Sequence, residues 1–165
     1  MHRRNWHYKG KSTCWLASGS KSGNKAPVFA IDIWDLKKQS DPRYERMRKK
    51  SGYNHSRILE IFCKQIKKAG VEQLITPIKT ESHIIGEARL RPVGLLFIDG
   101  NHTFESCNRD YSVWSKHVVK GGFIAFHDSS LPGVEKVISE IAQPDEKWND
   151  WQKTESLTVA TRSLS

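Results

Sequence analysis

The sequence predicts an α/β domain with a mostly parallel β-sheet and helices on both faces. The first observation is that short apolar runs, typical of strands in parallel sheets, alternate with segments whose apolar residues recur at helical spacing. The second is that two of these runs, residues 93–98 and 123–126, stop abruptly at Asp99 and Asp128. Because ligands of parallel sheets bind beyond the carboxyl ends of the strands, we expect a functional site at that edge.

The first elements are a short helix and a strand. Residues 12–22 predict the helix, with Trp15 and Leu16 facing inward, and residues 28–32 predict the first clear strand, which ends in an aspartate.

A longer helix is predicted by apolar residues three and four positions apart. Asn54 or Ser56 offers its N-cap and Gly70 stops it. Its apolar face consists of Ile58, Leu59, Phe62, Ile66 and Ala69. Residues 74–78 then predict a strand, which should lie at a sheet edge because Pro77 cannot donate a hydrogen bond to a neighbouring strand.

The second half begins with a helix expected over residues 82–90 and the strand over residues 93–98. The strongest helical pattern of the chain follows, with Thr103 as its cap and Gly121-Gly122 marking its end. Its inward face consists of Phe104, Cys107, Tyr111, Trp114 and Val118.

Three more elements complete the pattern after the strand at residues 123–126. One helix is expected to bury Val134, Val137, Ile138 and Ile141. Residues 151–156 and 157–162 alternate well enough for two closing strands, which we expect to form an antiparallel pair.

The composition fits one domain over residues 1–165, with 37% hydrophobic and 27% charged residues. No apolar run approaches the ~20 residues that span a bilayer, and the start of the chain has no apolar core of a signal peptide. Cys14, Cys63 and Cys107 are widely spaced without a CxxC pair, which is typical of reduced thiols. A cytoplasmic protein without a membrane partner is therefore expected.

The charge balance raises a second class of function. The chain has 27 Lys and Arg against 18 Asp and Glu, a formal net charge of +9, and seven of the cations lie in residues 37–50. Such a stretch could bind phosphate, as in a basic nucleic-acid-binding module whose affinity falls steeply with salt. The alternative is a solvated loop. Because the sequence has no RNP-type aromatic motif or zinc knuckle, nucleic acid ranks below a small-molecule partner.

The polar residues at the strand ends suggest specific chemistry. Asp32 could accept both hydroxyls of a ribose, or merely cap its loop. Asp99 and Asp128 offer two oxygen ligands for Mg²⁺, and His127 stands directly beside them; alternatively one aspartate caps the next helix. His102 could take the proton of a bound hydroxyl, or serve as a structural hydrogen-bonding residue.

The segment Lys9-Gly-Lys-Ser-Thr13 is similar to the end of a phosphate-binding loop, but the first glycine of that motif is replaced by Asn5. No Walker-type NTPase is expected. A glycine turn that leads into a helix N-terminus still suits an anionic or carboxylate group.

Several motifs together resemble the small class I S-adenosylmethionine-dependent methyltransferase domains. The matching residues are Leu95-Leu-Phe-Ile-Asp-Gly-Asn-His102, Asp110, Trp114, Gly121-Gly122, His127-Asp128 and Pro132-Gly-Val134, with weaker matches at Tyr8-Lys-Gly-Lys-Ser-Thr13 and Ala30-Ile-Asp-Ile-Trp34. The resemblance covers about Tyr8 to Ile141. It implies a Rossmann-like sheet of strand order 3-2-1-4-5-7-6, in which residues 74–78 are at an edge, as Pro77 already requires.

The resemblance also implies site residues. Gly10 and the neighbouring Lys9 and Ser12 would approach the methionine part of S-adenosylmethionine, and Asp32 would hold its ribose. Ser82 would lie near the adenine, and Asp99 is also expected to contact the cofactor. Metal-dependent relatives of the catechol O-methyltransferase type place acidic or basic residues at positions that match Asp99, Asp128 and His102 here, with Ser129 as a weaker match.

The N-terminus departs from the family pattern. The acidic residue and the glycine that end the family's first strand align with Arg4 and Trp6, and no apolar run precedes them. The first strand is therefore expected to be short or missing. Two consequences are considered: an inactive homologue that lacks the cofactor loop, and pairing of the incomplete sheet into a homodimer.

The leading hypothesis is O-methylation of a small-molecule or sugar hydroxyl. In it, Mg²⁺ at Asp99 and Asp128, with His127 as a further ligand, would orient the hydroxyl and lower its pKa, and His102 would take the proton. His102 and Asp99 are thus the predicted catalytic residues.

Overall fold

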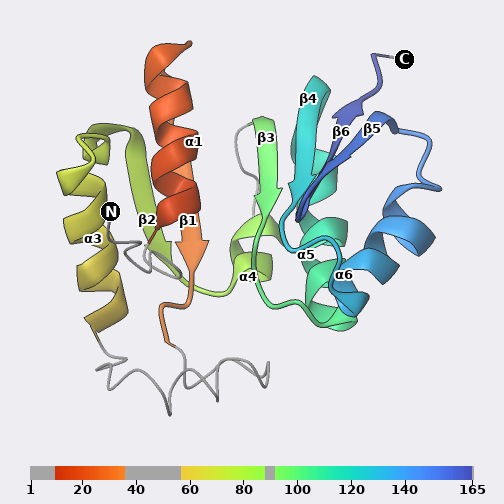
Figure 1. Ribbon diagram of the computed structural model, residues 1–165, viewed down its shortest axis with the longest axis horizontal. Coiled ribbons are helices and arrows are strands. Elements are labelled where there is room, and N and C mark those ends of the chain that lie inside the picture. The colour runs from red at the N-terminus through yellow and green to blue at the C-terminus, as the bar shows by residue number, and fades with distance from the viewer. Residues whose placement is uncertain (1–9, 36–56, 88–91, 165) are drawn as a thin grey trace. The chain divides into compact units, whose positions relative to one another are not determined.

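The computed structural model describes residues 10–35, 57–87 and 92–164, and the chain divides into two compact units, residues 1–81 and 82–165 (Figure 1). Each unit has a sheet and an apolar core of its own. One domain over residues 1–165 stays a prediction.

The first unit contains two helices and a parallel two-stranded sheet. Its elements are α1 (Lys11–Ser22), β1 (Val28–Asp32), α3 (Ile58–Lys68), the 3-10 turn η3 (Glu72–Leu74) and β2 (Ile75–Lys79). Phe62 and Ile66 of α3 pack with Ala17 of α1 and Ile75 of β2 in the core. The predicted stop of the longer helix is confirmed, since α3 ends at Lys68 and Gly70 follows with a φ of 66°.

The inward face predicted for the first helix is wrong at Trp15, which is 71% exposed. Ala17 is fully buried instead, and Cys14 packs against the same core. Small side chains on this face let α1 lie close to its neighbours, a position that an indole would not fit. β1 is also not buried on both faces, because Phe29 is 52% exposed.

The edge position expected for Pro77 agrees with the pairing. β2 pairs with β1 with Ala30 opposite Pro77, and no other strand among the described residues pairs with it.

The second unit contains the longer sheet. Its elements are α4 (Ser82–Glu87), β3 (Val93–Ile98), α5 (Phe104–Trp114), the 3-10 turn η4 (Ser115–His117), β4 (Val118–Phe126), α6 (Pro132–Val137), the π-helical turn η5 (Ile138–Ala142), β5 (Trp148–Thr154) and β6 (Leu157–Arg162). The strand order is β3-β4-β6-β5, with β3 and β4 parallel and the other pairs antiparallel. The helices α5 and α6 pack together on one face of this sheet (Figure 1).

These pairings reproduce two parts of the expected strand order. In the family's numbering, β1 and β2 are strands 2 and 3, and the second sheet has the order 4-5-7-6. The strand expected between the two parts would come from the N-terminal residues, which lie outside the described residues. The α/β class with a Rossmann-like arrangement is confirmed, whereas the complete order stays a prediction.

The end predicted for the strongest helix is wrong. α5 ends at Trp114, and Gly121-Gly122 lies within β4, which already begins at Val118. Gly121 has a φ of 73°, and a Cβ on Gly122 would come within 2.9 Å of the Gly94 carbonyl oxygen on β3. The pairing of β3 with β4 shifts in register between Val93 and Leu95. The two glycines allow the β4 backbone to adopt this irregular pairing close to β3.

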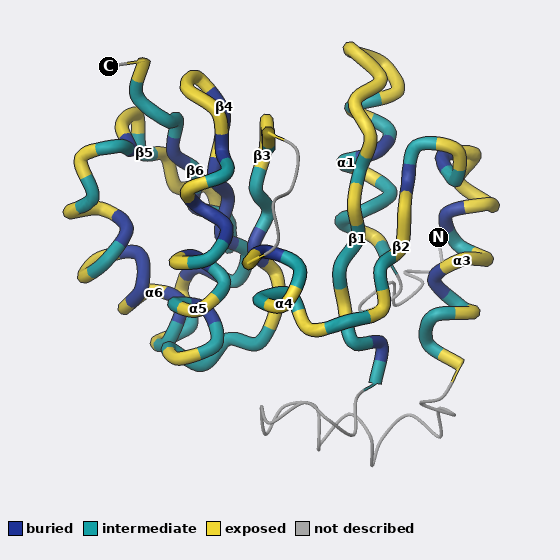
Figure 2. The backbone as a smooth tube through the Cα atoms, turned by 180° about the vertical axis from the view of Figure 1, so that it is seen from behind, coloured by how far each residue is buried: buried dark blue, intermediate teal, exposed yellow. Residues whose placement is uncertain are grey.

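β4 is the most buried strand of the second unit, as Figure 2 shows. Ile124 and Phe126 have no exposed surface and pack against α5 and α6.

A polar network centred on Tyr111 lies in the same core. The Tyr111 hydroxyl donates to Asp145 Oδ2 at 2.7 Å and accepts from Trp148 Nε1 at 2.9 Å. Burial and the bond to Asp145 raise the pKa of Tyr111, so the phenol stays protonated.

Several expectations concern residues outside the described part of the chain. They are the basic stretch at residues 37–50, the N-cap at Asn54 or Ser56, and the departures at Arg4 and Trp6. Within the described ranges, none of the helices has the length and apolar character needed to cross a bilayer.

Replacing Tyr111 with Phe should lower the free energy of unfolding by about 1–3 kcal/mol, because the buried Trp148 N–H loses its acceptor. Urea denaturation measures this. The control Ser112→Ala removes an exposed hydroxyl and should change stability by less than about 0.5 kcal/mol. Equal stability of Tyr111→Phe and the wild type would contradict a structural role of this network.

Candidate active site

Asp99 and Asp128 lie side by side, as the strand pattern predicted. Ile98 and Phe126 are partners in the parallel pairing of β3 and β4, and the His127 N–H donates to the Ile98 carbonyl at 3.0 Å. The two aspartates follow at the same edge. His127 Nδ1 lies 3.2 Å from Asp99 Oδ1 and 3.4 Å from Asp128 Oδ1. One imidazole nitrogen thus contacts both carboxylates.

His102 contacts the opposite side of the second carboxylate. Its Nε2 lies 3.2 Å from Asp128 Oδ2, and its side chain is only 8% exposed. Both ring nitrogens of His102 are closed to solvent. By contrast, the side chains of His127, Asp99 and Asp128 are each about one third exposed, at 35%, 34% and 35%. His102 can therefore orient Asp128, but an acceptor cannot reach its nitrogens in this arrangement.

The loop that carries His102 is fixed by local hydrogen bonds. Asn101 Oδ1 accepts from the Thr103 N–H at 3.0 Å, and Thr103 Oγ1 accepts from the Ser106 N–H at 3.3 Å. The second bond is the N-cap of α5 that the sequence predicted.

Gly133 supports the same loop from the first turn of α6. A Cβ at this position would lie 2.3 Å from the His102 carbonyl oxygen and 2.7 Å from the Phe104 nitrogen. Only glycine allows this approach without moving backbone. Gly133 has no role among the residues predicted from the sequence, although it lies in the Pro132-Gly-Val134 match. A glycine directly after a proline at a helix start is the signal that could have identified it.

Asp128 has a left-handed backbone with a φ of 52°, which is costly for a residue with a Cβ. Its carbonyl accepts from the Leu131 N–H, and the next residue, Ser129, donates its N–H to the Ser156 carbonyl, both at 2.9 Å. The bend between β4 and α6 is thereby fixed, and it sets the position of the Asp128 carboxylate.

The described side chains do not fit the expected magnesium site. Asp99, Asp128 and His127 were the predicted ligands, but the described ranges contain no group of three or more His, Cys, Asp or Glu that could hold a metal ion. The carboxylates contact imidazoles, whereas Mg²⁺ needs several oxygen ligands in octahedral geometry.

Two of the predicted cofactor residues lie around one aromatic pair in the first unit. Gly10, with a φ of 83°, precedes α1, and a Cβ there would lie 2.6 Å from Phe62 Cδ2. The centroid of the Phe62 ring is 5.3 Å from that of the Trp34 ring, and the backbone N–H of Trp34 donates to Asp32 Oδ1 at 2.6 Å. Both the loop-capping alternative for Asp32 and the glycine turn are therefore realised. Ser12 lies in the first turn of α1, and Lys9 lies outside the described residues.

The carboxyl group of Asp32 has an altered acidity. The residue is exposed at the end of β1, but neighbouring atoms limit the hydration of its carboxylate. The pKa of Asp32 is therefore raised, although the hydrogen bond from Trp34 acts in the opposite direction.

Ser82 belongs to a network in the second unit that sequence reasoning missed. Its oxygens accept from Trp114 Nε1, Oγ at 2.8 Å and the carbonyl at 3.2 Å. It also hydrogen-bonds the Asp110 carboxyl, whose pKa is raised by burial. A Cβ on Gly100 would lie 3.1 Å from Asp110 Oδ2, so this network supports the turn that follows Asp99.

The model of the methyltransferase domain family matches residues 7–129. The chain belongs to this family. The match confirms the resemblance to S-adenosylmethionine-dependent methyltransferases and includes Gly10, Asp32, Asp99 and Asp128.

Solved structures and a curated protein add to this likeness. The O-methyltransferase NovP is 11% identical with a TM-score of 0.69, covering 94% of this chain and 69% of that one. An O-methyltransferase of Bacillus cereus in complex with S-adenosylhomocysteine is 15% identical with a TM-score of 0.62, covering 94% and 70%. An rRNA methylase of Streptococcus thermophilus is 13% identical with a TM-score of 0.61, covering 94% and 82%.

One curated relative is protein R132 of Acanthamoeba polyphaga mimivirus. It is 33% identical over a segment that covers 30% of this chain and 26% of R132.

Gly133→Ala should destabilise the protein by about 1–3 kcal/mol, because the new methyl group forces the His102 loop away from α6. Thermal or urea unfolding measures the loss. Gly19→Ala is the matched control: nothing lies within 4 Å of its Cβ, so alanine should stabilise α1 by about 0.5–1 kcal/mol. A neutral Gly133→Ala would show that the loop does not depend on this contact.

Proposed function

We propose that this chain binds S-adenosylmethionine and transfers its methyl group to a hydroxyl oxygen of a small molecule or sugar. The observation that carries the proposal is the contact of His127 Nδ1 with both Asp99 and Asp128, at the carboxyl ends of paired parallel strands in a methyltransferase family member. Solved proteins of similar fold include O-methyltransferases, one of them in complex with S-adenosylhomocysteine.

The cofactor contacts that the resemblance implies are part of this proposal. Gly10 and Ser12, at the N-terminus of the 12-residue helix α1, suit the carboxylate of its methionine part. Asp32 at the end of β1 suits the ribose hydroxyls, and Lys9, Ser82 and Asp99 remain the other expected contacts. When bound, the cofactor supplies an electrophilic methyl group on a positively charged sulfur.

His127 is the base in this proposal. Its Nδ1 lies 3.2 Å from Asp99 Oδ1 and 3.4 Å from Asp128 Oδ1, and these two oxygens favour the neutral tautomer with its proton on Nδ1, in which the Nε2 lone pair would accept a proton. When that methyl group is transferred to the acceptor hydroxyl, the hydroxyl proton would pass to His127 Nε2. Asp99 and Asp128 orient the imidazole and stabilise its charged form.

The role assigned to His102 changes accordingly. Because both of its ring nitrogens are closed to solvent, we assign it the positioning of Asp128 rather than direct proton abstraction.

A magnesium-assisted reaction stays a hypothesis, and no step above depends on it. Turnover measured with EDTA is compared with turnover measured with added Mg²⁺. Equal turnover agrees with carboxylates that contact imidazoles. A loss of turnover in EDTA that Mg²⁺ restores would support the metal hypothesis.

Asp32→Asn should weaken S-adenosylmethionine binding about 10- to 100-fold, because it removes the charge from a hydrogen-bond acceptor for the ribose. Gly10→Ala should weaken it as well by forcing the turn before α1 away from Phe62. Isothermal titration calorimetry measures both. Asp150→Asn, in a strand of the second unit, should bind as the wild type does. If the wild type shows no binding, the proposed function fails and an inactive homologue is the better description.

His127→Gln should lower kcat about 10²- to 10⁴-fold while S-adenosylmethionine affinity is retained, because only the proton acceptor is lost. His102→Gln should lower kcat less. His117→Gln is the control, since its ring contacts the Gly86 carbonyl at 2.8 Å away from the two aspartates. Release of S-adenosylhomocysteine with a panel of hydroxyl acceptors measures turnover. The reverse order of the two losses would return the base role to His102.

A further inference from the structure

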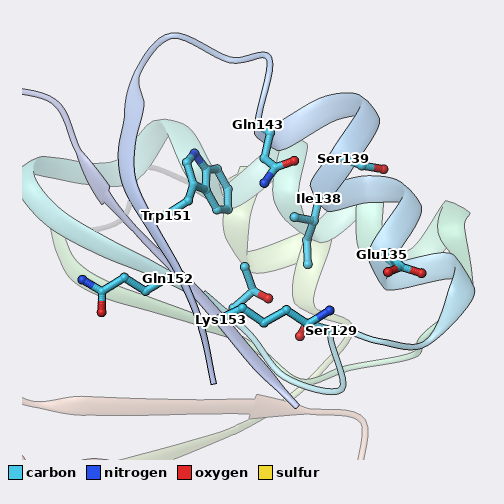
Figure 3. A pocket seen from close by; sticks show the side chains of 9 residues that line it. Ser129, Glu135, Ile138, Ser139, Gln143, Trp151, Gln152 and Lys153 are labelled. Atoms are coloured by element: carbon cyan, nitrogen blue, oxygen red, sulfur yellow. The ribbon is translucent and has the colours of Figure 1, made fainter. Parts of the chain in front are cut away.

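A pocket of about 230 Å³ lies within the second unit, between the helix α6–η5 and the β5–β6 hairpin (Figure 3). It begins one residue beyond Asp128, at Ser129. Its lining consists of Ser129, Glu135, Ile138, Ser139, Gln143, Trp151, Gln152, Lys153 and Thr158. The volume exceeds that of an engineered cavity of about 150 Å³ that binds benzene, so one six-membered ring fits.

The floor of the pocket contains a hydroxyl for which the described residues offer no hydrogen-bond partner. Ser129 is 1% exposed, and its Oγ is buried. Thr158, 5% exposed, is the other buried hydroxyl residue of the lining. Because a buried polar group without a partner destabilises the folded state, a native hydroxyl in this position indicates a bound partner.

The helix wall is shaped by a π-helical turn. In η5, the Gln143 N–H donates to the Ile138 carbonyl, five residues earlier, at 2.8 Å. This wide turn places Ile138, Ser139 and Gln143 on the pocket. Single π-turns of this kind occur frequently at functional sites.

The chemistry of the lining fits an uncharged ring with many hydroxyls. The Trp151 indole and Ile138 offer apolar surface on opposite sides of the space (Figure 3), while hydroxyl and amide groups offer both donors and acceptors. Lys153 and Glu135 are the two charged residues of the lining, and their charges are opposite. The lining therefore has no net charge to favour a phosphate or a carboxylate.

We propose that this pocket binds an uncharged hexose ring of the acceptor, as a free sugar or as part of a glycoside. The inference rests on the proposed function for its role, since Ser129 of the lining directly follows Asp128 in the chain, but sugar binding itself requires neither cofactor nor turnover.

Saturation-transfer difference NMR on the full chain, without S-adenosylmethionine, tests this. The probes are methyl glucopyranoside, methyl galactopyranoside and free glucose, with glucose 6-phosphate and phenol as the charged and aromatic comparisons. We expect ring-proton signals from at least one uncharged hexose at millimolar concentration. Binding of the methyl glycosides without free glucose would assign the site to glycosides, and binding of glucose would assign it to free sugars as well.

Variants locate the signal. Ser129→Ala should weaken hexose binding about 5- to 10-fold without lowering thermal stability, because it removes a hydroxyl that bonds to no residue of the described ranges. Trp151→Leu should abolish the signal, whereas Trp15→Leu, which removes an indole that is 71% exposed in the first unit, should leave it unchanged.

Three results would overturn the inference: no hexose signal, binding of phenol or glucose 6-phosphate alone, or hexose signals unaffected by Ser129→Ala and Trp151→Leu. A parallel calorimetric titration with S-adenosylmethionine keeps the two proposals apart. Hexose binding without cofactor binding would contradict the proposed function but support the hexose site. Cofactor binding without hexose binding would contradict only the hexose site.

Discussion

The parallel pairing of β3 with β4 is the constraint on which the candidate site depends. With Ile98 opposite Phe126 and the His127 N–H bonded to the Ile98 carbonyl, the residues after both strands emerge at one edge. A slip of one residue would turn successive side chains to the other face and separate Asp99 from Asp128. The core behind β4 prevents this, because Ile124 and Phe126 have no exposed surface and their places are fixed by α5 and α6.

Close backbone approach is the second recurring constraint. Gly133 brings α6 against the loop of His102, and Gly10 brings the turn before α1 against Phe62. In each unit a glycine thus permits contact between a helix start and a residue near the candidate site. The left-handed backbone of Asp128 adds a strained bend between β4 and α6, and strain of this kind is tolerated where it positions a functional group.

Much of the local structure was predictable from short-range patterns. The limits of β1 and β3, the Thr103 cap, the stop at Gly70 and the closing hairpin follow from apolar periodicity and from the chemistry of single residues. The errors arose where packing decides. Trp15 has the spacing of an inward residue but is exposed. Gly121-Gly122 resembles a helix stop but lies within β4, where Gly122 allows close approach to the β3 backbone.

The sequence by itself determined the family, the α/β class and which carboxylates end the strands, because those features are written in contiguous motifs and periodic patterns. Only the tertiary structure decided the separate roles proposed for the side chains at that edge, which are Asp99, His102, His127 and Asp128. Burial closes both nitrogens of His102, whereas His127 has only its Nδ1 buried and keeps about one third of its side chain exposed. This burial depends on residues such as Gly133 that are distant in the chain. The pocket next to Ser129 arises in the same way, from a π-turn and a hairpin that no local pattern brings together.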